Sequence, residues 1–376
     1  MARQTTKKKR LTVRDICRAV DELAPPALAY EWDRVGLNVG DPSNAVDCVV
    51  VALTVTPEAV AVAVKARAQL MVVHHPPIWE PLKSLRTDEP ATRLMLEVAQ
   101  AGISIYSAHT NLDVAPGGVN DILARRLCLT QVSPLFPCAH AGQVKLVTFV
   151  PESHLPQVRD AVCSAGAGVI GEYSHCSFST AGTGTFLPGK GASPFSGEKG
   201  KVNEEAERRF EVLAPKARLA GILQALNESH PYEEVAYDLI SLENADPRIG
   251  LGRRGKLREP MVVAAFVRHV CNKLNVSYAR VVGALKGKVQ DVAVLGGSGG
   301  GEISRLPEGV DIYVTGDVKY HDALIALEKG IIVVDAGHGG TEKHLTGVVA
   351  RYLKSRFNGL RVKDYVEPEL FQTEER

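Results

Sequence analysis

Histidines and carboxylates stand directly after several short apolar segments of this 376-residue chain. Three places carry pairs of them: His74 with His75, His109 with Asp113, and His338 with Glu342. Imidazoles and carboxylates are ligands for zinc, iron, manganese, cobalt and nickel, and a carboxylate can bridge two ions. The residue types therefore favour a metal site over a hydrolytic triad. The candidate metal ligands are His74, His75, Asp113, His338 and Glu342.

The sequence around His74 and His75 suggests that the two rings serve different ions. Neighbouring residues of a regular strand face opposite sides. Pro76 and Pro77 end the strand and hold His75 in an extended conformation. The two imidazoles can then be aimed at two ions instead of crowding one. An isolated His-His pair is more often a packing or surface feature, so this prediction depends on the other candidates lying nearby.

Six short runs rich in β-branched residues predict buried strands, and segments of helical period alternate with them. The strand runs are 47–54, 70–74, 103–108, 291–296, 310–316 and 331–337. The helical segments are 57–68, 89–102, 119–127, 321–330 and 341–355. This alternation predicts an α/β fold with parallel strands and helical crossovers.

The candidate ligands follow the carboxyl ends of these strands, where ligand sites form in open α/β sheets. Two further strand ends carry a glycine-rich loop at 296–302 and Asp317, with His321 four residues later. Five strand ends with such residues predict one shared pocket. We expect Thr341 to open the last helix, which places Glu342 in its first turn near the positive end of the helix dipole.

Several roles stay open at this stage. His109 is a candidate catalytic residue, a further ligand, or a donor that orients Asp113. His321 is a second candidate catalytic residue, or a surface residue of a helix that Asp317 caps. The glycine loop is either an anion-binding nest or a tight turn. Asp113 could instead cap the following helix, and Glu342 could be a solvated acid.

The middle of the chain has a different pattern. Between about 144 and 243 the order of predicted elements is β-α-β-β-α-β, which is typical of a ferredoxin-like domain. We expect this α+β domain, 141–245, to be inserted into an outer domain formed by 1–140 and 246–376. In this interpretation the outer strands on both sides of the insertion belong to one sheet. The segment HPYEE at 230–234 either lines an effector surface or ends a helix before a strand, and the second interpretation is slightly favoured.

Composition narrows the classes of protein. The 44 basic and 43 acidic residues nearly balance, so net charge indicates neither nucleic acid nor a membrane as a partner. No apolar run of about 18 residues is present to span a bilayer. The seven cysteines form no C-x-x-C pair, which predicts free thiols in the cytoplasm. The basic residues of MARQTTKKKR predict a solvated tail.

Several motifs together resemble the Nif-three-like proteins, often catalogued as GTP cyclohydrolase 1 type 2 homologues. They are WDRVGLNVGDPS at 32–43, HHPPIW at 74–79, AHTNLD at 108–113, TGDVKYHDA at 315–323 and DAGHGGTE at 335–342. HPYEEVAYDL at 230–239 is similar to a segment of the longer bacterial members. The resemblance covers about residues 11–372.

The resemblance implies two divalent metal ions per chain, held at the positions of His74, His75, Asp113, His338 and Glu342. It places His109 in the wall of the pocket. It also implies a homohexamer, a trimer of dimers, and a PII/CutA-like insertion. The catalogue name implies opening of a guanine ring, but no set of residues here predicts recognition of guanine.

Three functions remain. The first is a metal-dependent hydrolase of an unknown small-molecule substrate, in which His109 or His321 moves the proton. The second is a metal-handling or regulatory protein whose inserted domain senses a small effector or partner. The third and weakest is nucleic-acid binding through the basic tail, so we expect nucleic acid not to be a partner.

Overall fold

The computed structural model describes residues 10–138, 143–242, 244, 246 and 248–371. The chain divides into two compact units. Met1–Pro137 and Pro247–Arg376 form the first unit, and Cys138–Asp246 form the second. The described residues do not include the expected domain boundaries at 140/141 and at 245. They also do not include residues 1–9, which make up most of the basic tail.

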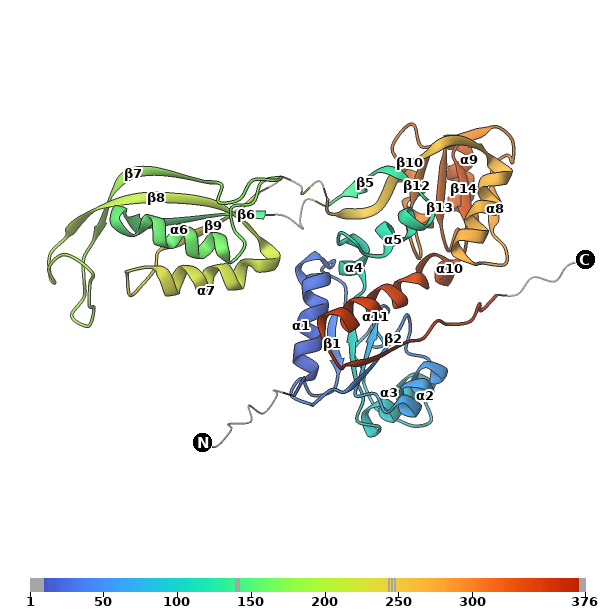
Figure 1. Ribbon diagram of the computed structural model, residues 1–376, viewed down its shortest axis with the longest axis horizontal. Coiled ribbons are helices and arrows are strands. Elements are labelled where there is room, and N and C mark those ends of the chain that lie inside the picture. Colours follow the sequence, from blue (N-terminus) through green and yellow to red (C-terminus); the bar gives the residue numbers. More distant parts are fainter. Residues whose placement is uncertain (1–9, 139–142, 243, 245, 247, 372–376) are drawn as a thin grey trace, which may run out of the picture. The chain divides into compact units, whose positions relative to one another are not determined.

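The first unit contains a five-stranded sheet in the order β1-β4-β3-β2-β15 (Figure 1). Its strands are β1 (Gly36–Val39), β4 (Ser104–Ser107), β3 (Leu70–Val73), β2 (Cys48–Ala52) and β15 (Arg361–Asp364). All neighbours are parallel except β1 and β4. Val73 pairs with Ser107, so β3 and β4 end side by side and the residues that follow them start from neighbouring positions.

A second sheet in the same unit has the order β11-β14-β13-β12-β10-β5. Its strands are β11 (Arg280–Val282), β14 (Ile332–Asp335), β13 (Ile312–Thr315), β12 (Lys288–Val294), β10 (Gly250–Val262) and β5 (Thr130–Pro137). The central strands β12, β13 and β14 are parallel, and the others join antiparallel. All six predicted strands and their parallel pairing are therefore present.

The expectation of one continuous sheet was wrong. The strands before the second unit and those after it form two separate sheets, because other strands complete each parallel set. β1 and β15 pair with the outer strands of the β2–β4 set, and β11 and β10 pair with those of the β12–β14 set. These four strands pair with the backbone N–H and C=O groups at the edges of the two parallel sets, so the two sets do not pair with each other.

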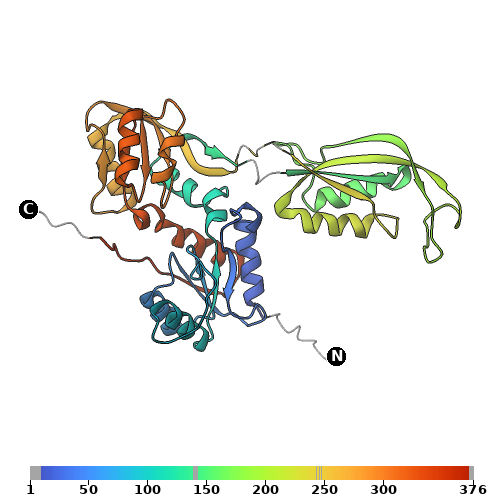
Figure 2. The same cartoon turned by 180° about the vertical axis from the view of Figure 1, so that it is seen from behind.

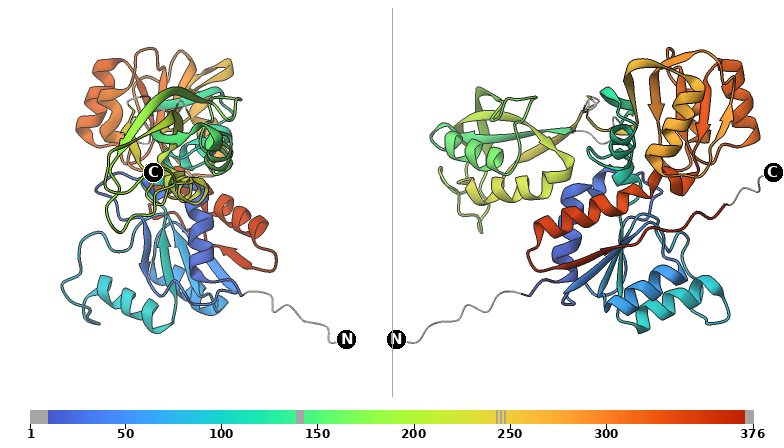
Figure 3. Two further views of the ribbon diagram at one scale, coloured as in Figure 1. Left: turned by 90° about the vertical axis from the view of Figure 1, so that its left-hand side faces the viewer. Right: turned by 45° about the vertical axis from the view of Figure 1, so that its right-hand side comes forward.

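Helices cover both faces of each sheet. In the first sheet α2 (Pro57–Ala66) and α3 (Pro90–Gln100) lie on one face, and α1 (Val13–Leu23) and α11 (His344–Arg356) on the other (Figure 3). In the second sheet α5 (Val119–Arg126) and α8 (Val263–Leu274) share one core with the strands, and α9 (Tyr320–Lys329) packs in another. Because both faces are covered, all five residues of β2 are buried, as is usual for parallel sheets.

Local sequence explains where several helices begin. Thr12 accepts a hydrogen bond from the Asp15 amide, and the Asp15 carboxylate accepts one from the Thr12 amide, which forms a capping box before α1. Thr56 caps α2, and Pro57 occupies its first position, where a missing N–H costs nothing.

The second unit has the predicted element order β-α-β-β-α-β. Its elements are β6 (Gln143–Pro151), α6 (Leu155–Ser164), β7 (Ser177–Phe186), β8 (Asn203–Pro215), α7 (Leu219–Ser229) and β9 (Tyr237–Ser241). The four strands form an antiparallel sheet in the order β7-β8-β6-β9. Both helices lie along one face of this sheet and share its apolar core (Figures 1 and 2).

Candidate metal centre

Three short connections in the first unit bring the predicted ligands together. His74 and His75 follow β3, His109 precedes the short helix α4 (Thr110–Val114), and α10 (His338–Glu342) follows β14. The ligand atoms form three sets, each with all its atoms within 4.8 Å of one another. These sets are His74, His75 and His109; His74, Asp113 and Glu342; and His75, His338 and Glu342.

His74 presents one ring nitrogen to two carboxylates. Its Nδ1–H donates to the carbonyl of Ala108 at 2.8 Å, which fixes the ring. Its Nε2 then lies 3.6 Å from Asp113 Oδ1 and 3.7 Å from Glu342 Oε1. His74 Nε2 and Asp113 Oδ1 are buried and have no hydrogen-bond partner among the described residues. Unpartnered buried polar atoms are costly, and a cation between these ligand atoms would satisfy them.

His75 faces the other side of Glu342. Its Nδ1 hydrogen bonds with Thr54 Oγ1 at 2.8 Å, and its Nε2 lies 3.1 Å from Glu342 Oε2. His338 Nε2 lies 3.2 Å from the same carboxylate oxygen and 3.2 Å from His75 Nε2. Two imidazole nitrogens and one carboxylate oxygen thus converge on a second point. Glu342 belongs to both ligand sets and offers a different oxygen to each.

The electrostatics of Glu342 suit an ionised ligand. The side chain is only 4 % exposed, and burial by itself would raise its pKa. The nearby His74, His338 and His75 outweigh this effect and hold the pKa of Glu342 well below its usual range. The group is therefore a carboxylate, held where cations are attracted.

His74 and Asp113 have shifted pKa values for opposite reasons. Burial lowers the pKa of His74, but the charges of Asp113 and Glu342 outweigh it and raise the pKa to about 9. Burial raises the pKa of Asp113 to about 6, although His74 acts against it. Positive charge at this place is thus stabilised by the carboxylates, and a metal ion would supply such charge with neutral imidazoles as ligands.

Two aspartates that were given no such role in the sequence interpretation orient the histidines. His109 Nδ1–H donates to Asp33 Oδ1 at 2.9 Å, and hydrogen bonds from His109 and Thr110 overcome burial to lower the pKa of Asp33 to about 2. Asp317 accepts a hydrogen bond from His338 Nδ1–H at 2.7 Å. The hydrogen bond of His338 to Glu342, together with the one to Asp317, raises the pKa of His338 to about 9. Carboxylates that orient ligand histidines are common around metal sites. The sequence feature that could have identified Asp33 as a residue of the site is its place in the WDRVGLNVG motif.

The glycine-rich loop packs closely against Glu342. Gly297 has a φ of +70°, and a Cβ there would lie 2.2 Å from Glu342 Oε1. Its amide donates to Thr341 Oγ1, and the amide of Gly299 donates to Thr315 Oγ1. Since hydroxyl groups of the chain use these amides, the geometry favours the tight turn over the anion nest.

The expected start of the last helix was wrong. Helix α10 already begins at His338, so Thr341 lies inside it and donates its hydroxyl to the carbonyl of His338. Gly337, with a φ of +77°, supplies the turn before it. A separate helix, α11, begins at His344.

The interpretation of Asp317 as a helix cap was also wrong, because Lys319 precedes α9 and Asp317 binds His338 instead. Asp317 has a φ of +54°, a left-handed conformation that aspartate tolerates better than most residues. His321 lies exposed in the first turn of α9, and its ring contacts Tyr320. Its catalytic role stays a prediction.

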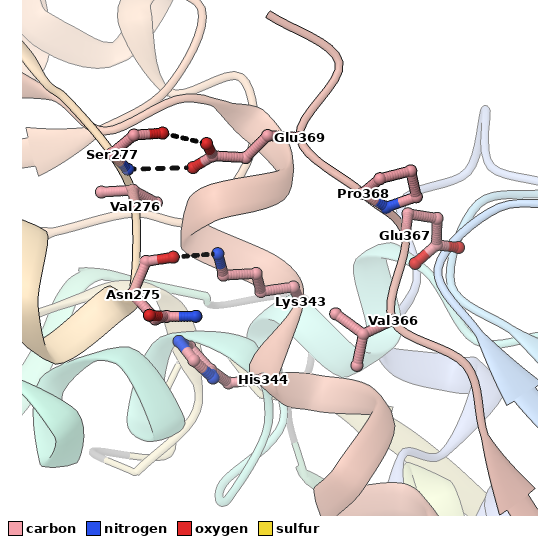
Figure 4. Close-up of a pocket in the computed structure, with 9 residues that line it drawn as sticks. All are labelled: Asn275, Val276, Ser277, Lys343, His344, Val366, Glu367, Pro368 and Glu369. Carbon is pink, nitrogen blue, oxygen red and sulfur yellow. Dashed lines mark hydrogen bonds between the residues drawn. The ribbon is translucent and has the colours of Figure 1, made fainter. Parts of the chain in front are cut away.

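The segment after β15 supports the loop behind His75. Glu367 Oε1 accepts from the amides of Leu53 and Thr54, each at 2.8 Å. Beside this segment lies a cavity of about 680 Å³, with Lys343 and His344 on one side and Val366 on the other (Figure 4). The Lys343 ammonium donates to the Asn275 carbonyl in its wall. The cavity is lined by none of the candidate metal ligands.

In the second unit, Tyr232, Glu233 and Glu234 of HPYEE help to line a cavity of about 680 Å³. His230 Nε2–H donates to the Phe149 carbonyl, and its Nδ1 accepts from the Tyr232 amide. Tyr232 donates its hydroxyl to Glu207 at 2.8 Å, and Glu233 accepts from the Ser193 amide at 2.7 Å. The segment therefore ends α7 at His230, as the structural interpretation held, while Glu233 and Glu234 line the cavity and His230 does not.

The fold and the site define a mixed α/β protein with a histidine and carboxylate cluster that could hold a metal. A family model described as Duf34/NIF3 (NGG1p interacting factor 3) matches residues 11–368. The chain is 42% identical over 351 residues to a "GTP cyclohydrolase 1 type 2 homolog" of Bacillus subtilis, covering 93% of this chain and 94% of that one. A relative of the same name in Mycobacterium tuberculosis is 38% identical over 348 residues, 91% of each chain.

Solved structures agree with these matches. A Bacillus cereus protein related to NIF3 superposes with a TM-score of 0.84 at 38% identity, covering 97% of this chain and 100% of that one. A Staphylococcus aureus protein gives 0.74 at 26% identity, with 97% and 99% covered. The chain belongs to the Duf34/NIF3 family, which confirms the resemblance seen in the motifs. No helix in the described ranges is long and apolar enough to cross a membrane.

Proposed function

We propose that this protein binds two divalent metal ions and uses them as a metal-dependent hydrolase. The observation that carries the proposal is the position of Glu342. One of its oxygens faces His74, which also faces Asp113, and the other faces His75 and His338. Two ligand sets that share one carboxylate match the donor geometry of a bridged pair of ions. These N and O donors suit zinc, iron, manganese, cobalt and nickel alike.

In the proposed reaction the ions would supply Lewis-acid chemistry for hydrolysis. The chain's own residues hold the ligands and move the proton. Asp33 fixes the ring of His109 by accepting from Nδ1–H, so the other ring nitrogen is turned toward His74 and His75. His109 is therefore the residue we propose for proton transfer, with His321 as the more exposed alternative.

Metal stoichiometry tests the site. Elemental analysis should give about two ions per chain for the native sequence and for an exposed control, Glu328→Gln. Asp113→Asn should retain about one ion, because it belongs to a single ligand set with Glu342. Glu342→Gln should lose both ions. An unchanged metal content in Glu342→Gln would refute the shared carboxylate.

Catalysis is tested separately with nucleotides, phosphodiesters and cyclic amides as substrates. The proposal requires turnover by the metal-loaded protein that falls at least a hundredfold in Glu342→Gln. Equal turnover by both proteins would indicate a contaminating activity. If the protein carries its full complement of metal and shows no turnover, the metal-site proposal stands and the hydrolase proposal is refuted.

A regulatory role is the second candidate, and the cavity beside HPYEE favours it. The strand order of the second unit supports our proposal that it is an inserted ferredoxin-like domain. A small effector bound there would be the signal that such a protein senses. The homohexamer implied by the family is also a proposal, which sedimentation velocity would test.

A further inference from the structure

Both tryptophans of this chain lie at the candidate metal centre, and both are exposed. The sequence contains only Trp32 and Trp79. Trp32 is 55% exposed and Trp79 is 46% exposed. Their ring centroids are 5.6 Å apart, and each ring lies against His109, at 6.4 Å for Trp32 and 5.8 Å for Trp79. Large aromatic rings gathered at a surface in this way mark a binding site.

His109 links the two tryptophans to the metal ligands. Its ring centroid is 5.2 Å from that of His74 and 5.8 Å from that of His75. A planar group resting on the tryptophans would therefore have its edge or its substituents beside the histidine and carboxylate cluster. An anionic oxygen carried by such a group is the kind of ligand that divalent ions bind.

The backbone under Trp32 is fixed to the same site. Its neighbour Asp33 accepts hydrogen bonds from His109 and from the Thr110 amide, and the Tyr30 amide donates to Thr110 Oγ1. The Tyr30 ring also stacks on Trp32, with 5.6 Å between centroids and 7° between planes. Trp32 is thus held in place before any ligand binds, which reduces the loss of conformational entropy on binding.

We propose that Trp32 and Trp79, whose ring planes are 54° apart, form a stacking platform in which a planar heteroaromatic ring lies flat on one indole and meets the other at an angle, and that the substrate carries such a ring together with an anionic oxygen. This inference rests on the proposed hydrolase function, since it names the class of substrate for the same metal centre. Stacking recognises the flat face of a ring and does not select one base over another.

The fluorescence of the two tryptophans can be used to measure ligand binding. Adenosine 5′-monophosphate is the probe, and ribose 5-phosphate is the matched control that has the phosphate but no ring. Tryptophan fluorescence of the full chain, excited at a wavelength that the probe does not absorb, should be quenched in a saturable way by the first compound only. Trp32→Leu and Trp79→Leu should each weaken binding at least fivefold while the remaining tryptophan still reports. Trp79→Phe should restore much of the affinity.

Tyr173→Leu, which changes an exposed ring in the second unit, should bind the probe as the native chain does. Metal content and circular dichroism should be unchanged in the Trp→Leu variants, because both side chains are exposed. Equal binding of the two compounds would overturn the platform, as would a normal affinity in each of the two single Trp→Leu variants. If the Trp→Leu variants instead change the oligomeric state and the native chain shows no quenching, a second copy covers the rings and the proposal is wrong.

The titration also separates this proposal from the one on which it rests. Saturable quenching in the metal-free protein, with an affinity at least fivefold weaker in Trp32→Leu, would support the platform even if no hydrolysis is found. Normal metal uptake without quenching would refute the platform alone.

Discussion

His74 Nε2 and Asp113 Oδ1 lie 3.6 Å apart in the interior, and neither has a hydrogen-bond partner among the described residues. The His74 side chain is 1% exposed and that of Asp113 is 15% exposed, so water does little to satisfy them. A buried polar pair without partners costs free energy in the folded state. A ligand that binds between the two atoms would remove this cost.

Metal should therefore stabilise the fold. At a free metal concentration one hundred times Kd, we expect about 2.7 kcal/mol of added stability for one site, because the ion binds the folded state in preference to the unfolded one. Treatment with a chelator should lower the melting temperature, and zinc or manganese should restore it. Glu342→Gln should show no response to either treatment. A chelator-sensitive melting temperature in that variant would show that the metal binds elsewhere.

Gly297→Ala should remove metal binding with little loss of fold. The added Cβ would lie 2.2 Å from Glu342 Oε1 and must displace that carboxylate. Gly287→Ala is a matched control, since Gly287 has a φ of +86° and a Cβ there meets no atom within 4 Å. We expect both variants to lose about 1 kcal/mol from backbone strain. Elemental analysis should show metal loss in Gly297→Ala alone, and equal retention in both would contradict the contact.

Arg253→Ala should destabilise the first unit strongly. The Arg253 side chain is 2% exposed and binds Asp121 through Nε at 2.7 Å and Nη2 at 2.8 Å. Removing one partner of a buried ion pair costs about 3–5 kcal/mol. Arg356→Ala breaks an exposed pair with Glu22 and should cost less than about 1 kcal/mol. Urea unfolding followed by tryptophan fluorescence measures both, and similar losses would refute the argument from burial.

His230 should make the stability of the second unit depend on pH. Burial lowers the pKa of His230 below its ordinary value of 6.5, although the hydrogen bond to the Phe149 carbonyl acts against it. The unfolded chain then binds a proton that the folded chain does not. The contribution of the neutral His230 ring to the free energy of unfolding is therefore fully present above about pH 6.5. It decreases as the pH falls toward the pKa of His230 in the folded chain, by at most about 1.4 kcal/mol per pH unit.

Calorimetry between pH 5 and pH 7 tests this dependence. His230→Gln should be less stable at neutral pH and should show a flatter pH profile than the native chain. His175→Gln, at an exposed position, serves as the control and should keep the native slope. A His230→Gln variant with the native slope would show that another group titrates.

Local pattern in the sequence determined the strands β2, β3, β4, β12, β13 and β14, and the residues that follow them. Apolar runs and their spacing depend on neighbours in the chain, so they can be recognised without a structure. The same information indicated that histidines and carboxylates gather after the strands, and the motifs then indicated the family. HPYEE was identified as the end of a helix for a similar reason, since Pro231 follows directly after His230.

Only the tertiary structure decided how these parts combine. The same apolar pattern fits a strand in either sheet, and the choice depends on distant strands such as β10 and β15. The pairing of Asp33 with His109 spans 76 residues, and that of Glu342 with His75 spans 267. Contacts over such separations follow from packing and have no local sequence signal. The sequence therefore supplied the candidate ligands, and the fold decided that Glu342 stands between the two sets.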